Sequence, residues 1–154
     1  MTGNPQPDLR RIIALDVGIR RIGLALSDPL RITAQGLETL VRKNLRHDVW
    51  KLSQLAKQHE ARMFLVGHPL HMSGDAGRQA HLVEEFSAKL EQRTGVPVKL
   101  WDERLTTVQA GRVLRSSGIS IEKRAKAVDR LSAVLILQSY LDSLPEACPW
   151  PEEQ

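Results

Sequence analysis

Two short apolar runs stand close together near the start of the chain, at residues 12–15 and 22–26. Two such runs joined by a few residues that include a glycine, here Gly18, predict a β-hairpin. Asp16 directly follows the first run, so it is expected at the end of a buried strand. A carboxylate in that position is costly unless a partner compensates its charge.

The remaining pattern predicts further strands alternating with helices. The expected elements are a third strand within 32–41, a helix capped by Asn44, a strand at 63–66, a helix at 79–92, a strand at 98–101, a helix that starts with a capping box at Thr106, and a nearly all-apolar, buried helix over 128–141. The order predicts an α/β fold with a mixed sheet of about five strands, three of them antiparallel and the later ones parallel to the first, flanked by helices.

Charged residues follow the strands at the edge where such sheets carry their functional sites. Ligands bind outside the carboxyl ends of parallel strands. Asp16 ends the first predicted strand, and Asp102 with Glu103 ends the last one. Asp129 lies at the start of the apolar helix, and the small residues after it would let that turn approach the sheet.

Converging carboxylates repel one another, and a divalent cation removes that penalty. Oxygen ligands suit Mg²⁺ or Mn²⁺, and a pair of such ions supports phosphodiester hydrolysis. The alternative for each residue is structural. Glu103 could pair with Arg104 or Arg112, and Asp129 with Arg124 or Arg130. Their joint position at strand ends favours the metal site.

Length and composition bound the protein further. At 154 residues we expect one domain over 10–144, with a disordered leader at 1–9 and a Pro-rich tail at 145–154. The net charge of +4 mildly favours a polyanionic partner. The single cysteine excludes an internal disulfide, and the absence of a signal peptide or a membrane-spanning run predicts a cytoplasmic protein without a membrane partner.

Four motifs carry a resemblance to a known family. ALDVGIRRIGLALSDP, VGHPLHMSGDAG, DERLTT and AVDRLSAVLILQSYLD follow one another in order over roughly residues 11–142. Together they resemble the YqgF/RuvX family, which is similar to Holliday-junction resolvases of the RuvC type and has an RNase H-like fold. The resemblance implies a divalent-metal nuclease that matures the 5′ end of pre-16S ribosomal RNA, with resolution of four-way DNA junctions as the alternative.

The resemblance also implies roles for single residues. Asp16, Glu103 and Asp129 match the catalytic, metal-binding acids of the family. Asp102 is held as a supporting ligand, because strand alternation turns it away from the face of Glu103. The sequence departs from the family at His68, where an apolar residue is usual, and at Ser132, where alanine is common.

Substrate contacts are expected from cationic and polar residues near this edge, namely Arg20, Arg21, Arg104 and His71. Only 4% of the residues are aromatic, so recognition of backbone and shape is favoured over base stacking on aromatic side chains. Trp101 is expected to serve packing. A zinc site at the loop histidines and a two-lobed ATPase are weak alternatives. A binding module that holds nucleic acid without cutting it is the main competing class, and the protein is expected to be a monomer or a homodimer.

Overall fold

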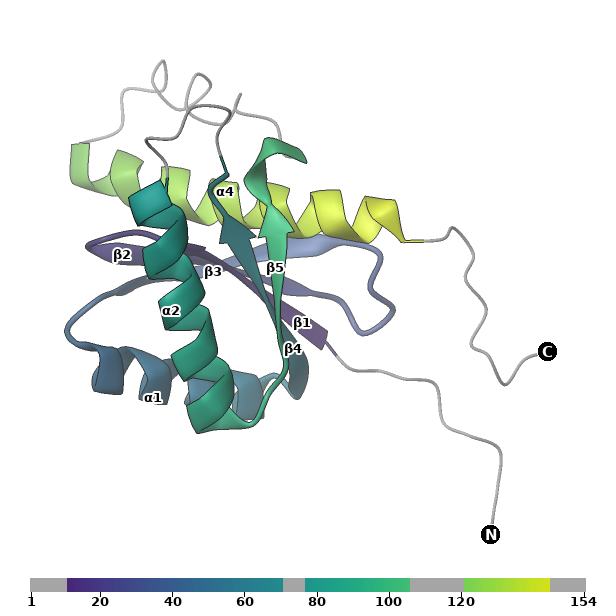
Figure 1. Ribbon diagram of the computed structural model, residues 1–154. Coiled ribbons are helices and arrows are strands. Elements are labelled where there is room, and N and C mark those ends of the chain that lie inside the picture. Colours follow the sequence, from purple (N-terminus) through teal and green to yellow (C-terminus); the bar gives the residue numbers. More distant parts are fainter. Residues whose placement is uncertain (1–10, 71–76, 106–120, 145–154) are drawn as a thin grey trace, which may run out of the picture.

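Five strands form a single mixed sheet in the order β3-β2-β1-β4-β5 (Figure 1). The computed structural model describes residues 11–70, 77–105 and 121–144. The strands are β1 (Arg11–Val17), β2 (Arg21–Ser27), β3 (Ala34–Val41), β4 (Ala61–His68) and β5 (Val98–Asp102). β1 pairs antiparallel with β2 and parallel with β4, β2 pairs antiparallel with β3, and β4 pairs parallel with β5. The predicted sheet is therefore confirmed.

Helices cover both faces of the sheet. They are α1 (Leu45–Gln58), α2 (Gly77–Thr94) and α4 (Ile121–Ser143), with a short 3₁₀ turn, η2 (Glu103–Leu105), directly after β5. α1 and α2 pack on one face and α4 crosses the other (Figure 1). α1 begins where its cap predicts, because the Asn44 side chain accepts a hydrogen bond of 2.8 Å from the backbone N–H of His47.

Strand alternation divides the core into two layers. Ile13, Leu15 and Val17 of β1 point to the α1/α2 face, where they pack with residues such as Leu52 and Phe86. Ile12 and Ala14 point to the α4 face, with Ala25, Leu65 and the helix residues Ala133, Ile136, Leu137 and Leu141. Asp16 continues the second series, so its side chain belongs to the face that α4 covers.

Small residues let α4 lie close to the sheet. A Cβ atom added at Gly23 of β2 would stand 1.9 Å from the backbone oxygen of Asp129, and one at Gly36 of β3 would stand 2.5 Å from Cγ of Arg130. α4 buries only one side fully, and Arg130 and Asp142 are exposed. The expectation of an all-round buried helix is wrong in that respect, although the helix itself is confirmed.

The end of β4 differs from the prediction. β4 runs through Gly67 and His68 instead of ending at Val66, because both residues still pair with Trp101 and Asp102 of β5. The helix predicted from Thr106 and the loop residue His71 lie outside the described residues, as do the leader and the tail. Within the described ranges, no helix is both long enough and apolar enough to cross a membrane.

Candidate active site

The candidate site is built around Asp16, the last residue but one of β1. Its partner in the antiparallel register on β2 is Gly23. On the other side of β1, Leu15 pairs with Val66 of β4, so Gly67 lies on the neighbouring strand at the level of Asp16. Asp16 is therefore flanked on the α4 face by two residues that have no side chain.

Each glycine makes room for another carboxylate-bearing residue. Gly23 lets the backbone of α4 approach at Asp129, as described above. A Cβ atom at Gly67 would stand 2.6 Å from Oε1 of Glu103 and 2.6 Å from Cδ1 of Ile136. The Glu103 side chain thus lies over Gly67, beside Asp16. Three acids that are far apart in the sequence are brought together by β1, η2 and α4.

The pKa of Asp16 reflects the proximity of the other two acids. The pKa of Asp16 is raised to about 7, first by burial, then by the negative charges of Glu103 and Asp129, and last by a hydrogen bond between the side chains of Asp16 and Glu103. Two carboxyl groups in hydrogen-bond contact share a proton, because the doubly ionised pair is strongly repulsive. Near neutral pH this edge of the sheet holds a proton that a cation could replace.

Asp129 has a cationic partner already. Its Oδ2 accepts a hydrogen bond of 2.7 Å from Nε of Arg21, the first residue of β2. Both side chains are partly exposed, at 24% and 30%. Arg21 was expected to contact substrate, and its observed partner is one of the three acids.

Asp102 and Glu103 differ in their surroundings. Asp102 ends β5, and its carboxylate accepts hydrogen bonds of 2.7–3.0 Å from the Arg104 side chain. This hydrogen bonding lowers the pKa of Asp102, whereas the neighbouring Glu103 faces Asp16. Strand alternation predicts that only one of the two faces the metals directly. In the structure the strand ends at Asp102 and the chain turns into η2 at Glu103.

The other expected contacts lie around this edge. Arg20 is exposed in the β1–β2 turn, and Arg104 is half-exposed beside Asp102. His71 lies outside the described residues. His68 is bound to Glu84 of α2, with 2.7 Å between Nε2 and Oε2. Trp101 packs edge-on against Tyr140 and donates a 3.3 Å hydrogen bond to Ser139, so it serves packing as expected.

The donor set suits a hard divalent cation in its chemistry. Three carboxylates from three elements meet at one edge, and the raised pKa of Asp16 shows the penalty that a cation would remove. As the side chains stand in residues 11–70, 77–105 and 121–144, no group of three or more His, Cys, Asp or Glu residues is arranged to hold a metal ion. One oxygen of the third acid, Asp129, is held by Arg21 in this arrangement.

Sequence reasoning found the acids and missed the two glycines that bring them together. A glycine within a strand often marks a place where another backbone or a ligand approaches closely. Gly23 stands inside the second apolar run, so that signal was present there, whereas Gly67 was predicted to follow its strand and is found inside β4 only in the structure. The partner helix and the distance could not be read from it.

Comparisons with known proteins find relatives over most of the chain. A model of the RuvX family, described as Holliday junction resolvase, matches residues 10–143. A protein of Koribacter versatilis named "Putative pre-16S rRNA nuclease" is 57% identical over 132 residues, which are 86% of each chain. One of the same name from Lachnospira eligens is 48% identical over 136 residues, which cover 86% of this chain and 97% of the relative.

The fold has a solved counterpart. Thermus thermophilus RuvC in complex with its Holliday junction substrate superposes with a TM-score of 0.50 at 12% identity, over 84% of this chain and 91% of RuvC. At that identity the match speaks for the fold alone, which is RNase H-like. Because the family model and the relatives both span nearly the whole described region, the chain belongs to the RuvX family and is a nuclease.

Proposed function

We propose that the protein is a divalent-metal-dependent nuclease that hydrolyses phosphodiester bonds in maturing the 5′ end of pre-16S ribosomal RNA. The observation that carries the proposal is the convergence of three carboxylates from β1, η2 and α4 at one edge of the sheet, where the pKa of the partly buried Asp16 is raised to about 7 beside Glu103 and Asp129. The names of the relatives supply the substrate. A ribosomal RNA precursor as substrate implies a cytoplasmic enzyme.

Asp16, Glu103 and Asp129 would hold Mg²⁺ or Mn²⁺. Held there, such cations would supply activation of the attacking water and stabilisation of the leaving oxygen. Asp16 must give up its proton for this role, and Asp129 must exchange Arg21 for the cation. Asp102 would be a supporting ligand only, because its carboxylate is bound to Arg104 at the border of the site.

Arg20, Arg21, Arg104 and His71 would contact the substrate. An Arg21 side chain released from Asp129 stands at the site with its charge available to a phosphate. Arg20 is exposed in the turn that follows Asp16 and Val17. Such contacts to the backbone position the nucleic acid and carry no base preference.

Resolution of four-way DNA junctions is the second candidate, favoured by the description of the family model and by the fold shared with RuvC. A resolvase must make two symmetric cuts, which calls for a homodimer. An RNA-processing nuclease can act as a monomer. The two candidates therefore differ in substrate and in the assembly that each requires.

The test offers the protein, with Mn²⁺ or Mg²⁺, an RNA that carries a precursor 5′ extension and a four-way DNA junction in parallel reactions. The Asp16→Asn variant, purified in the same way, controls for contaminating nucleases. We expect metal-dependent cutting of the RNA extension and none with the variant. Paired symmetric nicks in the junction, with the RNA intact, would replace the first candidate by the second. Full cutting by Asp16→Asn would reject the site.

A further inference from the structure

A cavity of about 750 Å³ opens on the face of the sheet opposite to the carboxylates. It is bordered by the β1–β2 turn at Gly18, the residues that lead into α1, and the outer side of α2 at Leu82 and Lys89. Val17 and Gly18 line it and directly follow Asp16 in the chain. One border of the cavity therefore lies at the same end of β1 as Asp16.

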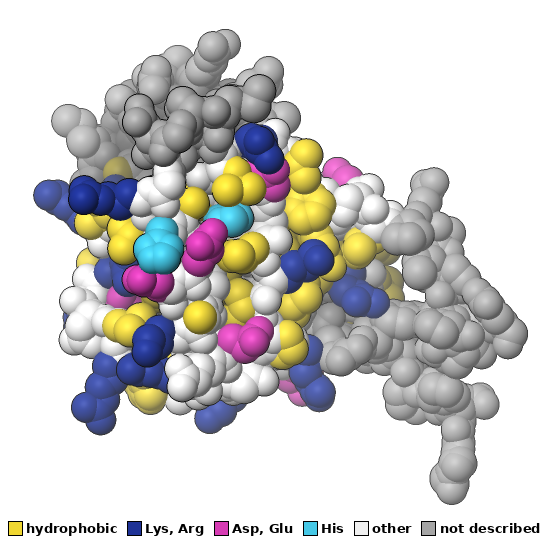
Figure 2. All heavy atoms as spheres, in the orientation of Figure 1, with side chains coloured by type: hydrophobic (Ala, Val, Ile, Leu, Met, Phe, Trp, Pro, Cys, Tyr) yellow, Lys and Arg dark blue, Asp and Glu magenta, His cyan; other side chains and the backbone are white. Residues whose placement is uncertain are grey.

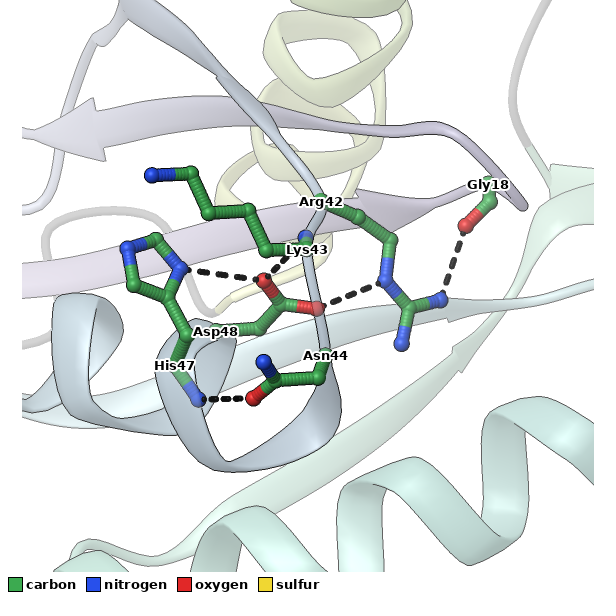
Figure 3. Close-up of polar contacts among 6 residues, drawn as sticks. All are labelled: Gly18, Arg42, Lys43, Asn44, His47 and Asp48. Atoms are coloured by element: carbon green, nitrogen blue, oxygen red, sulfur yellow. Dashed lines mark hydrogen bonds and ion pairs between the residues drawn. The ribbon is translucent and has the colours of Figure 1, made fainter.

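The guanidinium of Arg42 is fixed in the wall of this cavity (Figure 3). Its Nε donates a 3.0 Å hydrogen bond to Oδ2 of Asp48, and its Nη1 donates one of 2.9 Å to the carbonyl of Gly18. One side of the group lies over the Phe86 ring, with 5.1 Å between Cζ and the ring centroid. The plane of the guanidinium is thus set by three elements.

Asp48 balances the charge of Arg42 and is itself fully buried. Its Oδ1 accepts a 3.1 Å hydrogen bond from the backbone N–H of Lys43, and Nδ1 of His47 lies 3.5 Å from the same oxygen. A buried carboxylate with this many partners holds the arginine in one orientation. The Arg42 side chain nevertheless remains 24% exposed, and its Nη2 donates to no atom of the described residues.

The remaining lining combines an apolar wall with cations at the rim. Leu82 is 48% exposed and Ile19 is 81% exposed, and Val83 and Phe86 lie beneath them. Lys43 and Lys89 are exposed at the mouth, with Glu85 as the exposed acid among the lining residues. A planar cation, an apolar wall and surface lysines complement an aromatic group that carries negative charge.

We propose that this cavity binds one unpaired nucleotide of the nucleic-acid substrate, with its base stacked on the Arg42 guanidinium and its phosphates facing Lys43 and Lys89. The proposal rests on the proposed nuclease function and adds where a nucleotide near the scissile bond is held. Bases stack on arginine planes as they do on aromatic rings. Because only 4% of the residues are aromatic, Arg42 would serve as the stacking surface that an aromatic side chain provides in other proteins.

The test uses single-stranded RNA oligonucleotides with 2-aminopurine placed at one position at a time. They are titrated into the Asp16→Asn protein, which retains the substrate uncut. We expect one position at which the fluorescence changes strongly on binding and becomes shielded from acrylamide. Leu82→Glu in the same background puts a negative charge at the mouth and should abolish that change and weaken binding about tenfold.

Gln92→Glu is the matched control, because it adds the same charge at an exposed position of α2 outside the cavity. It should leave the signal unchanged. Arg42→Lys keeps the charge and removes the plane, so it should lose the signal even where the oligonucleotide still binds. Arg42→Lys also disturbs the buried Asp48, so circular dichroism is used to check that this variant is folded. If the Arg42→Lys variant is unfolded, the Leu82→Glu variant alone provides the test.

The result that overturns the proposal is a signal at no position, or one that Leu82→Glu leaves intact. Conversion of a dimer to a monomer by Leu82→Glu, seen by sedimentation, would assign the cavity to a second copy of the chain instead. The wild-type cleavage assay separates the two proposals. Cutting without an aminopurine signal removes only the cavity, and a signal without metal-dependent cutting removes only the nuclease mechanism.

Discussion

The environment of Asp16 disfavours the charge of its carboxylate. Its folded pKa of about 7 stands above the ordinary value of 3.8, because of burial first and the neighbouring acids second. The folded state therefore keeps a proton that the unfolded chain releases. The stability that this proton confers is complete below about pH 4 and is lost as the pH rises to 7.

This gives a prediction for the metal-free protein. In EDTA, the free energy of unfolding of Asp16→Asn minus that of the wild type should increase by about 2–4 kcal/mol as the pH rises from 4 to 8. Urea unfolding at several pH values measures it. Asp142→Asn, an exposed acid of α4, is the control and should follow the wild type. Parallel curves for Asp16→Asn and the wild type would show that Asp16 ionises normally.

The ion-pair partners of the acids could not be predicted from the sequence. The expected arginine partners of Asp129 were its neighbours on the helix, yet Arg21, 108 positions away, holds it. Arg104 was a candidate partner of Glu103, and it binds Asp102. Such pairings depend on the rotamers and on the turn at η2, which no local pattern encodes. The choice of the acids themselves depended on strand ends and motifs, which are local.

At the scale of elements, the site depends on how closely α4 and η2 approach the sheet. Gly23 and Gly67 set these two distances, but the groups that they face differ. Gly23 faces the helix backbone at Asp129, which cannot move without moving α4. Gly67 faces the ends of two side chains, which can rotate away.

Gly23→Ala should therefore destabilise the fold strongly, by about 3 kcal/mol, because its Cβ would stand 1.9 Å from a backbone oxygen. Urea unfolding provides the measurement. Gly77→Ala is the matched control, since nothing lies within 4 Å of a Cβ atom at that position. Equal stabilities for the two variants would contradict the close contact of α4 with β2.

Gly67→Ala should behave in the opposite way. The fold should lose about 1 kcal/mol or less, while metal-dependent cleavage falls at least about tenfold, because the new methyl group displaces the Glu103 carboxylate from Asp16. Cleavage rates at saturating substrate, measured beside Gln92→Ala, give the comparison. A variant that cuts at the wild-type rate would show that the position of Glu103 over Gly67 is unimportant for cutting.

At the scale of the whole molecule, most of the fold could be predicted from the hydrophobic pattern of the sequence. The two apolar runs of β1 and β2, the Asn44 cap and the apolar run of β4 each predict the element that is observed. Element ends were less accurate, since β4 gains residues through pairing with β5, a contact between distant segments. The cavity beside Arg42 was not foreseen, because its walls come from a turn, a strand end and two helices.

A thermal titration with Mn²⁺ near pH 7.5 tests whether Asp16, Glu103 and Asp129 form a cation-binding site. If Asp16, Glu103 and Asp129 hold the cation, the melting temperature of the wild type should rise by several degrees at Mn²⁺ concentrations well above the dissociation constant. Asp142→Asn should show the same rise, and Asp16→Asn should show none. An equal rise in all three proteins would place the metal elsewhere and show that Asp16 is not one of its ligands.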